Sequence, residues 1–171
     1  MDNTPFERAV VYLIQHDAEG AMGVVINHSD NMKLGEIFRQ LEISVNSPTL
    51  QNQAVLTGGP LQPHSGFVIH PPGGNWNSSV TMNPKIAVTS SKDILVAIAS
   101  GKYLDSAVLA LGYAGWSAGQ LEAEIGRNDW LCTPASENII FHTPMTERWE
   151  ESMHLLGIKD IAQLSSWVGH A

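Results

Sequence analysis

A chain of 171 residues with a mass of 18.5 kDa corresponds to one ordinary domain, since globular domains commonly hold about 100 to 200 residues. Its seventeen acidic and nine basic side chains give a net charge of −8 without any cluster of Lys or Arg, which argues against direct nucleic-acid binding. Apolar residues make up 43% and charged residues only 15%, below the roughly 25% of typical domains, so we expect a well-packed core and no disorder.

The first residues, Met1 to Thr4, lack the basic region and the apolar stretch of a signal peptide. No apolar run elsewhere approaches the ~20 residues that cross a bilayer. We therefore expect a cytoplasmic protein that does not enter a membrane.

The chain then predicts a β-hairpin. Two continuous apolar runs, 9–14 and 21–26, flank a turn-like sequence at 16–20. Continuous rather than alternating apolarity indicates strands that are covered on both faces, as in a layered domain, with short buried helices as the alternative. The next apolar side chains have the spacing of one helix face: Leu34, Ile37, Phe38 and Leu41.

Turns rich in glycine and proline divide the middle of the chain into short pieces that favour β-strands. The predicted strands are 54–56, 67–69, 80–82 and 86–89. Ser90 and Asp93 then form an acidic variant of the capping box, which predicts a helix that ends at Gly101.

The segment from Gly112 to Glu124 supports two interpretations. In the first, an apolar strand over 106–111 passes through a glycine turn into a helix that Ser117 and Gln120 begin as a capping box. In the second, the Gly-x-Ser-x-Gly pattern at 115–119 is the nucleophile elbow of a hydrolase.

A serine hydrolase would also need an acid and a histidine after Ser117. The candidates in that chain order are Asp129 with His142 or His154. Asp129 follows Ser117 by only twelve positions, which leaves little room for an α/β-hydrolase fold, so the helix cap is the favoured interpretation.

The C-terminal part predicts a second hairpin and a helix. Two β-like runs, 130–132 and 139–141, are separated by Pro134. The side chains that follow have helical spacing and precede Gly157: Met145, Trp149, Met153 and Leu156. A short helix over 161–168 would end the chain.

The single cysteine, Cys132, lies in one of these strand-like runs, which predicts a buried and inert thiol. One cysteine cannot form an internal disulfide, in agreement with a reducing compartment. A nucleophilic Cys132 with His142 or His70 as base stays open as an alternative, although Arg127 is the only cation nearby in the sequence.

No metal and no nucleotide cofactor is expected. No two of the seven histidines lie three or four residues apart, and the chain has no Cys-x-x-Cys, so most histidines are expected in turns or on the surface. The two common nucleotide loops, Gly-x-x-x-x-Gly-Lys-Ser/Thr and Gly-x-Gly-x-x-Gly, are missing as well.

Seven short motifs follow one another in a distinctive order. They are Phe6-Glu7-Arg8-Ala9-Val10, the run 20–27, Gly58-Gly59-Pro60, Gly66-Phe67-Val68-Ile69-His70, Gly112-Tyr113-Ala114-Gly115-Trp116, Gly119-Gln120-Leu121-Glu122 and Gly169-His170-Ala171. Together they resemble the bacterial YqgE/AlgH family over nearly the whole chain. The resemblance implies a single α+β domain over 1–171, with a β-rich, largely antiparallel core, peripheral helices and no established enzymatic activity.

The resemblance also suggests a function and a surface. Part of the family name refers to a regulatory role in alginate synthesis, which implies a regulatory or ligand-binding protein that acts indirectly on transcription. Its partner would be an unknown protein or small molecule. The expected groove is lined by signature positions at turns, with Trp76 as a further wall: Asn27, Gly58, Gly59, Gly66, His70, Gly112, Trp116 and Gln120.

Two alternatives accompany this expectation. The glycines could simply allow tight connections between short strands. The protein could also be a small hydrolase or thiol enzyme that uses Ser117 or Cys132 with a histidine. Similar proteins usually begin with an extra apolar strand before the Phe-x-Arg motif, so the resemblance implies that this strand is missing here. We expect the open sheet edge to favour self-association or to lower the stability.

Overall fold

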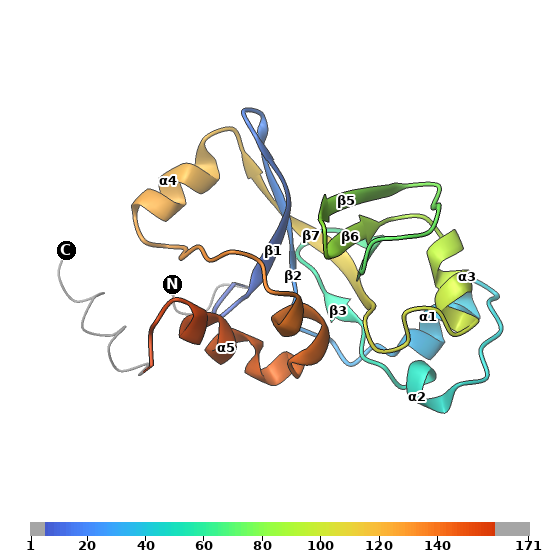
Figure 1. The fold of residues 1–171 in the computed structure, drawn as a ribbon. Helices are drawn as coiled ribbons and strands as arrows, with labels where there is room; N and C mark the ends of the chain where they lie inside the picture. The colour runs from blue at the N-terminus through green and yellow to red at the C-terminus, as the bar shows by residue number, and fades with distance from the viewer. Residues whose placement is uncertain (1–5, 160–171) are drawn as a thin grey trace.

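One seven-stranded sheet organises residues 6–159, which are the residues that the computed structural model describes (Figure 1). The strands are β1 (Val11–Asp17), β2 (Gly20–Val25), β3 (Leu56–Thr57), β4 (Leu61–His70), β5 (Ser79–Asn83), β6 (Ile86–Thr89) and β7 (Val108–Ser117). Their order is β1-β2-β7-β4-β6-β5, and β3 also pairs with β7. Every pair is antiparallel except β3 with β7, which confirms the predicted α+β class with a largely antiparallel core.

Five α-helices and two short helical turns surround this sheet. They are α1 (Leu34–Gln40), α2 (Pro48–Gln51), α3 (Asp93–Ala99), α4 (Gln120–Gly126) and α5 (Arg148–Leu155), with a π-helical turn η1 (Asn138–His142) and a 3-10 turn η2 (Met145–Glu147). Figure 1 shows α4 and α5 flanking the β1–β2 hairpin, and α1 to α3 at the other end of the sheet. No helix in the described part of the chain is long and apolar enough to cross a membrane.

The predicted N-terminal hairpin is confirmed. β1 pairs with β2 so that Val11 lies opposite Val25 and Asp17 opposite Gly20. A register shift between Leu13 and Gln15 marks a β-bulge, a feature that increases the local twist of a strand. Because β1 comes first in the strand order, it forms one edge of the sheet.

The central strand β7 is longer than the sequence predicted. The strand expected over 106–111 continues to Ser117, and the glycine turn expected after it is part of the strand. The first half of β7 pairs with β4 and β3, and its second half pairs with β2. Gly112 adopts φ +77° inside the strand, where a side chain would collide with the Gly59 backbone. This glycine therefore allows the two backbones to pack closely and does not form a turn.

The middle of the chain follows the predicted pattern, with one correction. The strands expected near 54–56, 67–69, 80–82 and 86–89 correspond to β3, β4, β5 and β6. Helix α1 buries Leu34, Ile37 and Phe38, as its spacing predicted. Helix α3 has Lys92 rather than Ser90 as its N-cap residue, and the Ser91 hydroxyl donates to Asp93 at 2.5 Å instead.

The second predicted hairpin is wrong. Residues 130–135 form no regular element, and the run 139–141 lies within the π-helical turn η1. This turn buries two consecutive side chains, Ile139 and Ile140, against the core, whereas consecutive residues of a strand would point to opposite faces. The predicted C-terminal helix is present as α5, and the short helix expected over 161–168 lies outside the described residues.

Candidate functional site

Four of the predicted groove positions pack backbone against backbone at the middle of β7. The Gly58 N–H donates to the Leu111 carbonyl at 2.8 Å, and Gly66 lies opposite Leu111 in the β4–β7 ladder. A Cβ atom on Gly59 or Gly112 would overlap the backbone of the other segment. Close backbone contacts therefore account for Gly58, Gly59 and Gly112, whereas a Cβ atom on Gly66 would make only ordinary contacts, and any binding role for these positions stays a prediction.

The side chain of Asn27 also has a structural role, because it forms two hydrogen bonds with the backbone. Its side-chain oxygen accepts from the Val10 N–H at 2.8 Å, and its side-chain amide donates to the Arg8 carbonyl at 2.8 Å. These two bonds hold the segment that enters β1 against the end of β2.

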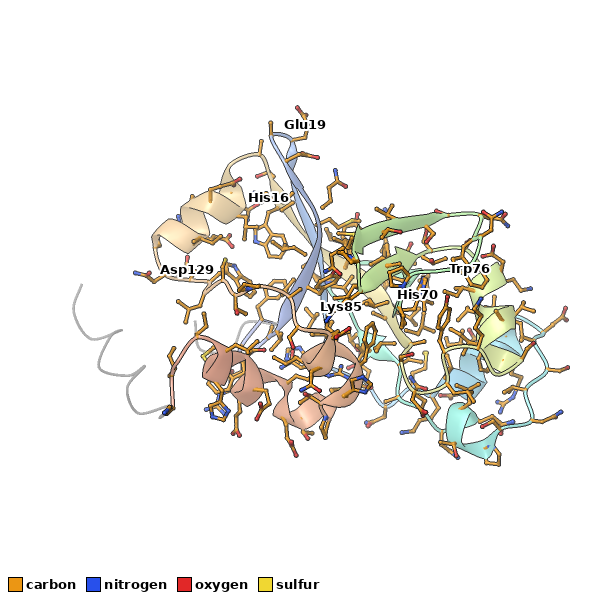
Figure 2. The ribbon with its side chains drawn as sticks, in the orientation of Figure 1. His16, Glu19, His70, Trp76, Lys85 and Asp129 are labelled. Atoms are coloured by element: carbon orange, nitrogen blue, oxygen red, sulfur yellow. The ribbon has the colours of Figure 1, made fainter. Side chains whose placement is uncertain are left out.

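His70 is completely buried at the end of β4, which corrects the expectation of a turn or surface histidine. Its Nδ1 donates to the Pro71 carbonyl at 2.6 Å, and its Nε2 hydrogen-bonds the Thr89 hydroxyl at 2.7 Å. Trp76 lies beside it, with the ring centres 6.3 Å apart (Figure 2). Burial lowers the pKa of His70, the bond to Pro71 opposes this effect in part, and repulsion from Lys102 adds to it.

The buried His70 predicts a stability that falls in acid. Because its folded pKa lies below the ordinary 6.5, the unfolded chain binds the proton more readily than the native protein. The contribution of neutral His70 is therefore complete above pH 6.5 and is lost as the pH falls from there through the folded pKa. We expect His70→Gln to weaken this dependence. Urea unfolding at about pH 7.5 and about pH 5.5 checks it, and an equal loss in both proteins would contradict the assignment.

The predicted positions do not share one groove. His70 pairs with Ala87 of β6 and follows Ile69, which pairs with Val108 at the start of β7. Trp116 lies at the Ser117 end of β7, and Gln120 follows that end in α4. A strand of ten residues spans about 30 Å at ~3.3 Å per residue, which separates the two groups.

Trp116 belongs to an aromatic cluster around a carboxylate. The indole N–H groups of Trp116 and Trp130 both donate to Oε2 of Glu124 at 2.8 Å, and the Gln120 amide donates to Oε1 at 3.0 Å. Burial alone would raise the pKa of Glu124, but the donors of Trp130, Gln120 and Trp116 outweigh it and lower the pKa. An ionised Glu124 therefore holds the start of coil 130–136 beside β7 and α4.

The capping box predicted from Ser117 and Gln120 forms only in half. The Ser117 N–H donates to Oε1 of Gln120 at 3.0 Å, and the Ser117 hydroxyl donates to the same oxygen at 3.2 Å. The N-cap of α4 is Gly119 with φ +74°, and no side chain caps this helix. Since β7 extends to Ser117, the helix starts two residues later than a Ser117 cap requires.

The residues proposed for a serine triad are not brought together. Ser117 is exposed and bonded to Gln120, Asp129 pairs with Arg127 at 3.2 Å, and His154 pairs with Glu151 at 3.4 Å. Within residues 6–159 no hydrogen bond joins Ser117 to a histidine. The same part of the chain contains no group of three or more His, Cys, Asp and Glu side chains that could hold a metal ion.

Cys132 is exposed, so the prediction of a buried thiol is wrong. The coil that carries Cys132 is not a strand, and it lies over a cavity of about 290 Å³ that we call the tryptophan cavity. Its walls are residues 9–13, Ile26, Trp116, Leu121, 130–136, Ile139, Ile140, Trp149, Ser152, Met153, Leu155 and Leu156. None of these side chains is charged.

A second cavity, of about 630 Å³, lies between α1, α3 and β4. Gly59 and Gly66 line it, together with core residues and the exposed side chains of Asp30, His64 and Lys92. We take the tryptophan cavity as the candidate site because Trp116 and Cys132 line it and none of its described wall side chains is charged, whereas Asp30 and Lys92 line the second cavity.

Comparisons with known proteins agree on one family. The AlgH-like family model matches residues 1–160. A UPF0301 protein of Chromobacterium violaceum is 45% identical over 171 residues, covering all of this chain and 91% of that protein. A UPF0301 protein of Photobacterium profundum is 43% identical over 175 residues, covering all of this chain and 93% of that protein.

Two solved structures are similar as well. The solution structure of AlgH from Pseudomonas aeruginosa has a TM-score of 0.79 at 38% identity, covering all of this chain and 90% of that one. A crystal structure of a protein from Corynebacterium diphtheriae has a TM-score of 0.68 at 20% identity, covering 90% and 80%, and supports the fold alone. The names of these proteins state no reaction, substrate or partner.

Proposed function

We propose that this chain, which belongs to the AlgH-like family, is a regulatory binding module that takes an uncharged apolar ligand into the tryptophan cavity. The observation that carries the proposal is that, among residues 6–159, no charged side chain lines this open cavity, which is rich in tryptophan. Ligand sites are mostly apolar, with a few polar groups that fix orientation. Here Cys132, Thr133 and Ser136 are the polar groups on the coil side.

The rim of the cavity supports an apolar ligand. Leu131 and Leu155 line it and are 48% and 53% exposed, so a ligand that covered them would remove apolar surface from water, worth roughly 25 cal/mol per Å². The indole N–H groups of Trp116 and Trp130 are already bonded to Glu124. The indoles therefore offer a ligand their apolar rings rather than hydrogen bonds.

We propose that the ligand binds in the cytoplasm. The protein then affects transcription indirectly, through a partner. A net charge of −8 favours an indirect route, because the phosphate backbone of DNA would be repelled.

A thiol enzyme is the second candidate, and the exposure of Cys132 at the cavity favours it. It needs a base near the thiol. His70 is buried and bonded to Thr89, and His142 is exposed, with no hydrogen bond to Cys132 among the described residues. A Cys132 that reacts with iodoacetamide no faster than free cysteine would argue against this candidate.

The proposal predicts that a charge on the rim weakens binding. We expect Leu155→Asp to reduce the affinity for the uncharged dye N-phenyl-1-naphthylamine by about tenfold, because the carboxylate must lose water when the dye covers it. Leu104→Asp is the matched control, since Leu104 is 52% exposed and does not line the cavity. Dye fluorescence titrations measure both. Equal affinities for the two variants, or no binding by the unmodified protein, would refute the proposal.

A further inference from the structure

We infer that the ligand of the tryptophan cavity is an extended peptide strand, which pairs with the open edge of β1 and inserts uncharged apolar side chains on both sides of it. This inference rests on the proposed function and names the chemical class of its ligand. Peptides that add a strand to a sheet gain affinity from backbone hydrogen bonds and specificity from side-chain pockets.

The first observation is the unpaired edge of β1. β2 is the ladder partner of β1, and β1 stands at the end of the strand order. Among residues 6–159, no backbone hydrogen bond outside that ladder involves residues 11–13. In an antiparallel pair, alternate residues direct their N–H and C=O groups away from the partner strand. Among the described residues, these outward-facing groups of β1 therefore have no strand partner.

The second observation places the cavity at that edge. Tyr12 packs with Ile139 and Ile140 on one face of the sheet, whereas Val11 and Leu13 pack with Trp116 and its neighbours on the other. These three residues of β1, Val11, Tyr12 and Leu13, all line the tryptophan cavity. A space that contacts both faces of one strand lies beside that strand, where the next strand of the sheet would run.

The walls of the cavity define the side chains of the bound strand. Because the described side chains on both faces are mostly apolar and none is charged, consecutive residues of the peptide must be apolar, as in strands buried on both sides. The part of the chain that lines the cavity, residues 9–13, is about 17 Å long when extended. This length accommodates about five peptide residues.

The charges beyond the cavity define one end of the peptide. Past the bulge, β1 carries His16 and Asp17 toward the hairpin tip, where Glu19 lies (Figure 2). The Gln15 side chain and the Glu19 N–H donate to Asp17 and lower its pKa, and the bond from His16 lowers the pKa of Glu122. Both carboxylates are thus ionised at neutral pH. A basic residue at the tip end of the peptide complements them.

The probe is the peptide acetyl-Lys-Val-Ile-Leu-Val-Ala-Lys-amide, which has five apolar residues and a basic residue at each end, so that it can pair in either direction. Two control peptides have the same side chains but carry N-methyl groups on alternate apolar residues, in the two complementary sets. In a paired strand, only one set of N–H groups faces β1. Titration calorimetry on the full chain measures the three affinities.

We expect the unmodified peptide to bind, one methylated peptide to bind at least about tenfold more weakly, and the other to bind nearly as well as the unmodified one. Hydrogen exchange should also slow at the outward-facing amides of residues 11–13 when the peptide is bound.

Three results would overturn the inference. If both methylated peptides bind as well as the unmodified one, the ligand is held by side chains alone, and the apolar cavity of the proposed function survives without strand pairing. If the dye binds but the peptide does not, the ligand is not an extended strand; a dimer in light scattering that Leu155→Asp dissociates would then identify the occupant as a second copy of the chain. If neither dye nor peptide binds, the proposed function itself has failed.

Discussion

Gly112→Ala is expected to reduce the free energy of unfolding by about 3 kcal/mol. Gly112 has φ +77°, a conformation that costs a residue with a Cβ atom about 1 kcal/mol. The added carbon would also overlap the Gly59 carbonyl oxygen, and this neighbour is backbone that cannot rotate away. Separating the two segments would disturb the contact between the β3–β4 connection and β7, at the centre of the sheet.

Gly119→Ala separates the two causes. Gly119 has nearly the same conformation, φ +74°, but no atom lies within 4 Å of the position of its Cβ. We expect it to cost only about 1 kcal/mol. Urea unfolding of both variants measures the difference. Equal losses would show that the close approach of Gly59 to β7 contributes nothing.

Arg148→Leu is expected to cost about 3 kcal/mol. Arg148 is only 8% exposed, and its guanidinium donates to the Thr143 carbonyl at 3.1 Å and to the Ile26 carbonyl. Burial lowers the pKa of Arg148, and no carboxylate pairs with it within residues 6–159. Leucine would leave two buried carbonyls without donors, each worth about 1 to 3 kcal/mol.

The same substitution at an exposed arginine provides the control. Arg127 pairs with Asp129 at 3.2 Å, but its side chain is 63% exposed, so Arg127→Leu should change the stability by about 0.5 kcal/mol or less. Since Ile26 lines the tryptophan cavity, Arg148→Leu should also weaken dye binding. Equal stability losses for the two variants would contradict the role of Arg148 in holding α5 against β2.

The sequence predicted the elements in which one strong pattern dominates. The runs 9–14 and 21–26 became the hairpin, and the spacing of Leu34, Ile37 and Phe38 became the buried face of α1. The prediction of a turn at Gly112 was wrong because a glycine in a sequence is equally consistent with a turn and with a close approach of two backbones. Only the folded position of Gly59 distinguishes the two.

The run 139–141 misled for a different reason. Three apolar residues are too few to separate a strand from a helical turn by periodicity. Burial of both Ile139 and Ile140 on the same side required the helical turn, and the coil before it left Cys132 exposed rather than buried.

The candidate site was predicted only in part. Trp116 and Cys132 were singled out, but Glu124 and Trp130, which fix the cluster, were not. In the sequence, Glu124 resembles any other polar residue on a helix, and Trp130 falls in a run that predicts a strand. The cavity also joins residues 9–13 to coil 130–136, and no local pattern in the sequence relates segments so far apart.

The central claim, that a peptide strand occupies the tryptophan cavity at the edge of β1, is tested most directly by the reactivity of Cys132. This residue is the only cysteine of the chain, it is exposed, and it lines the cavity, so its modification by the uncharged reagent N-ethylmaleimide reports on that site alone. We predict that saturating Lys-Val-Ile-Leu-Val-Ala-Lys peptide slows the modification at least about tenfold, and that the more weakly binding of the two N-methylated peptides slows it much less at the same concentration. An unchanged rate at a peptide concentration that saturates binding would place the peptide elsewhere and contradict the claim.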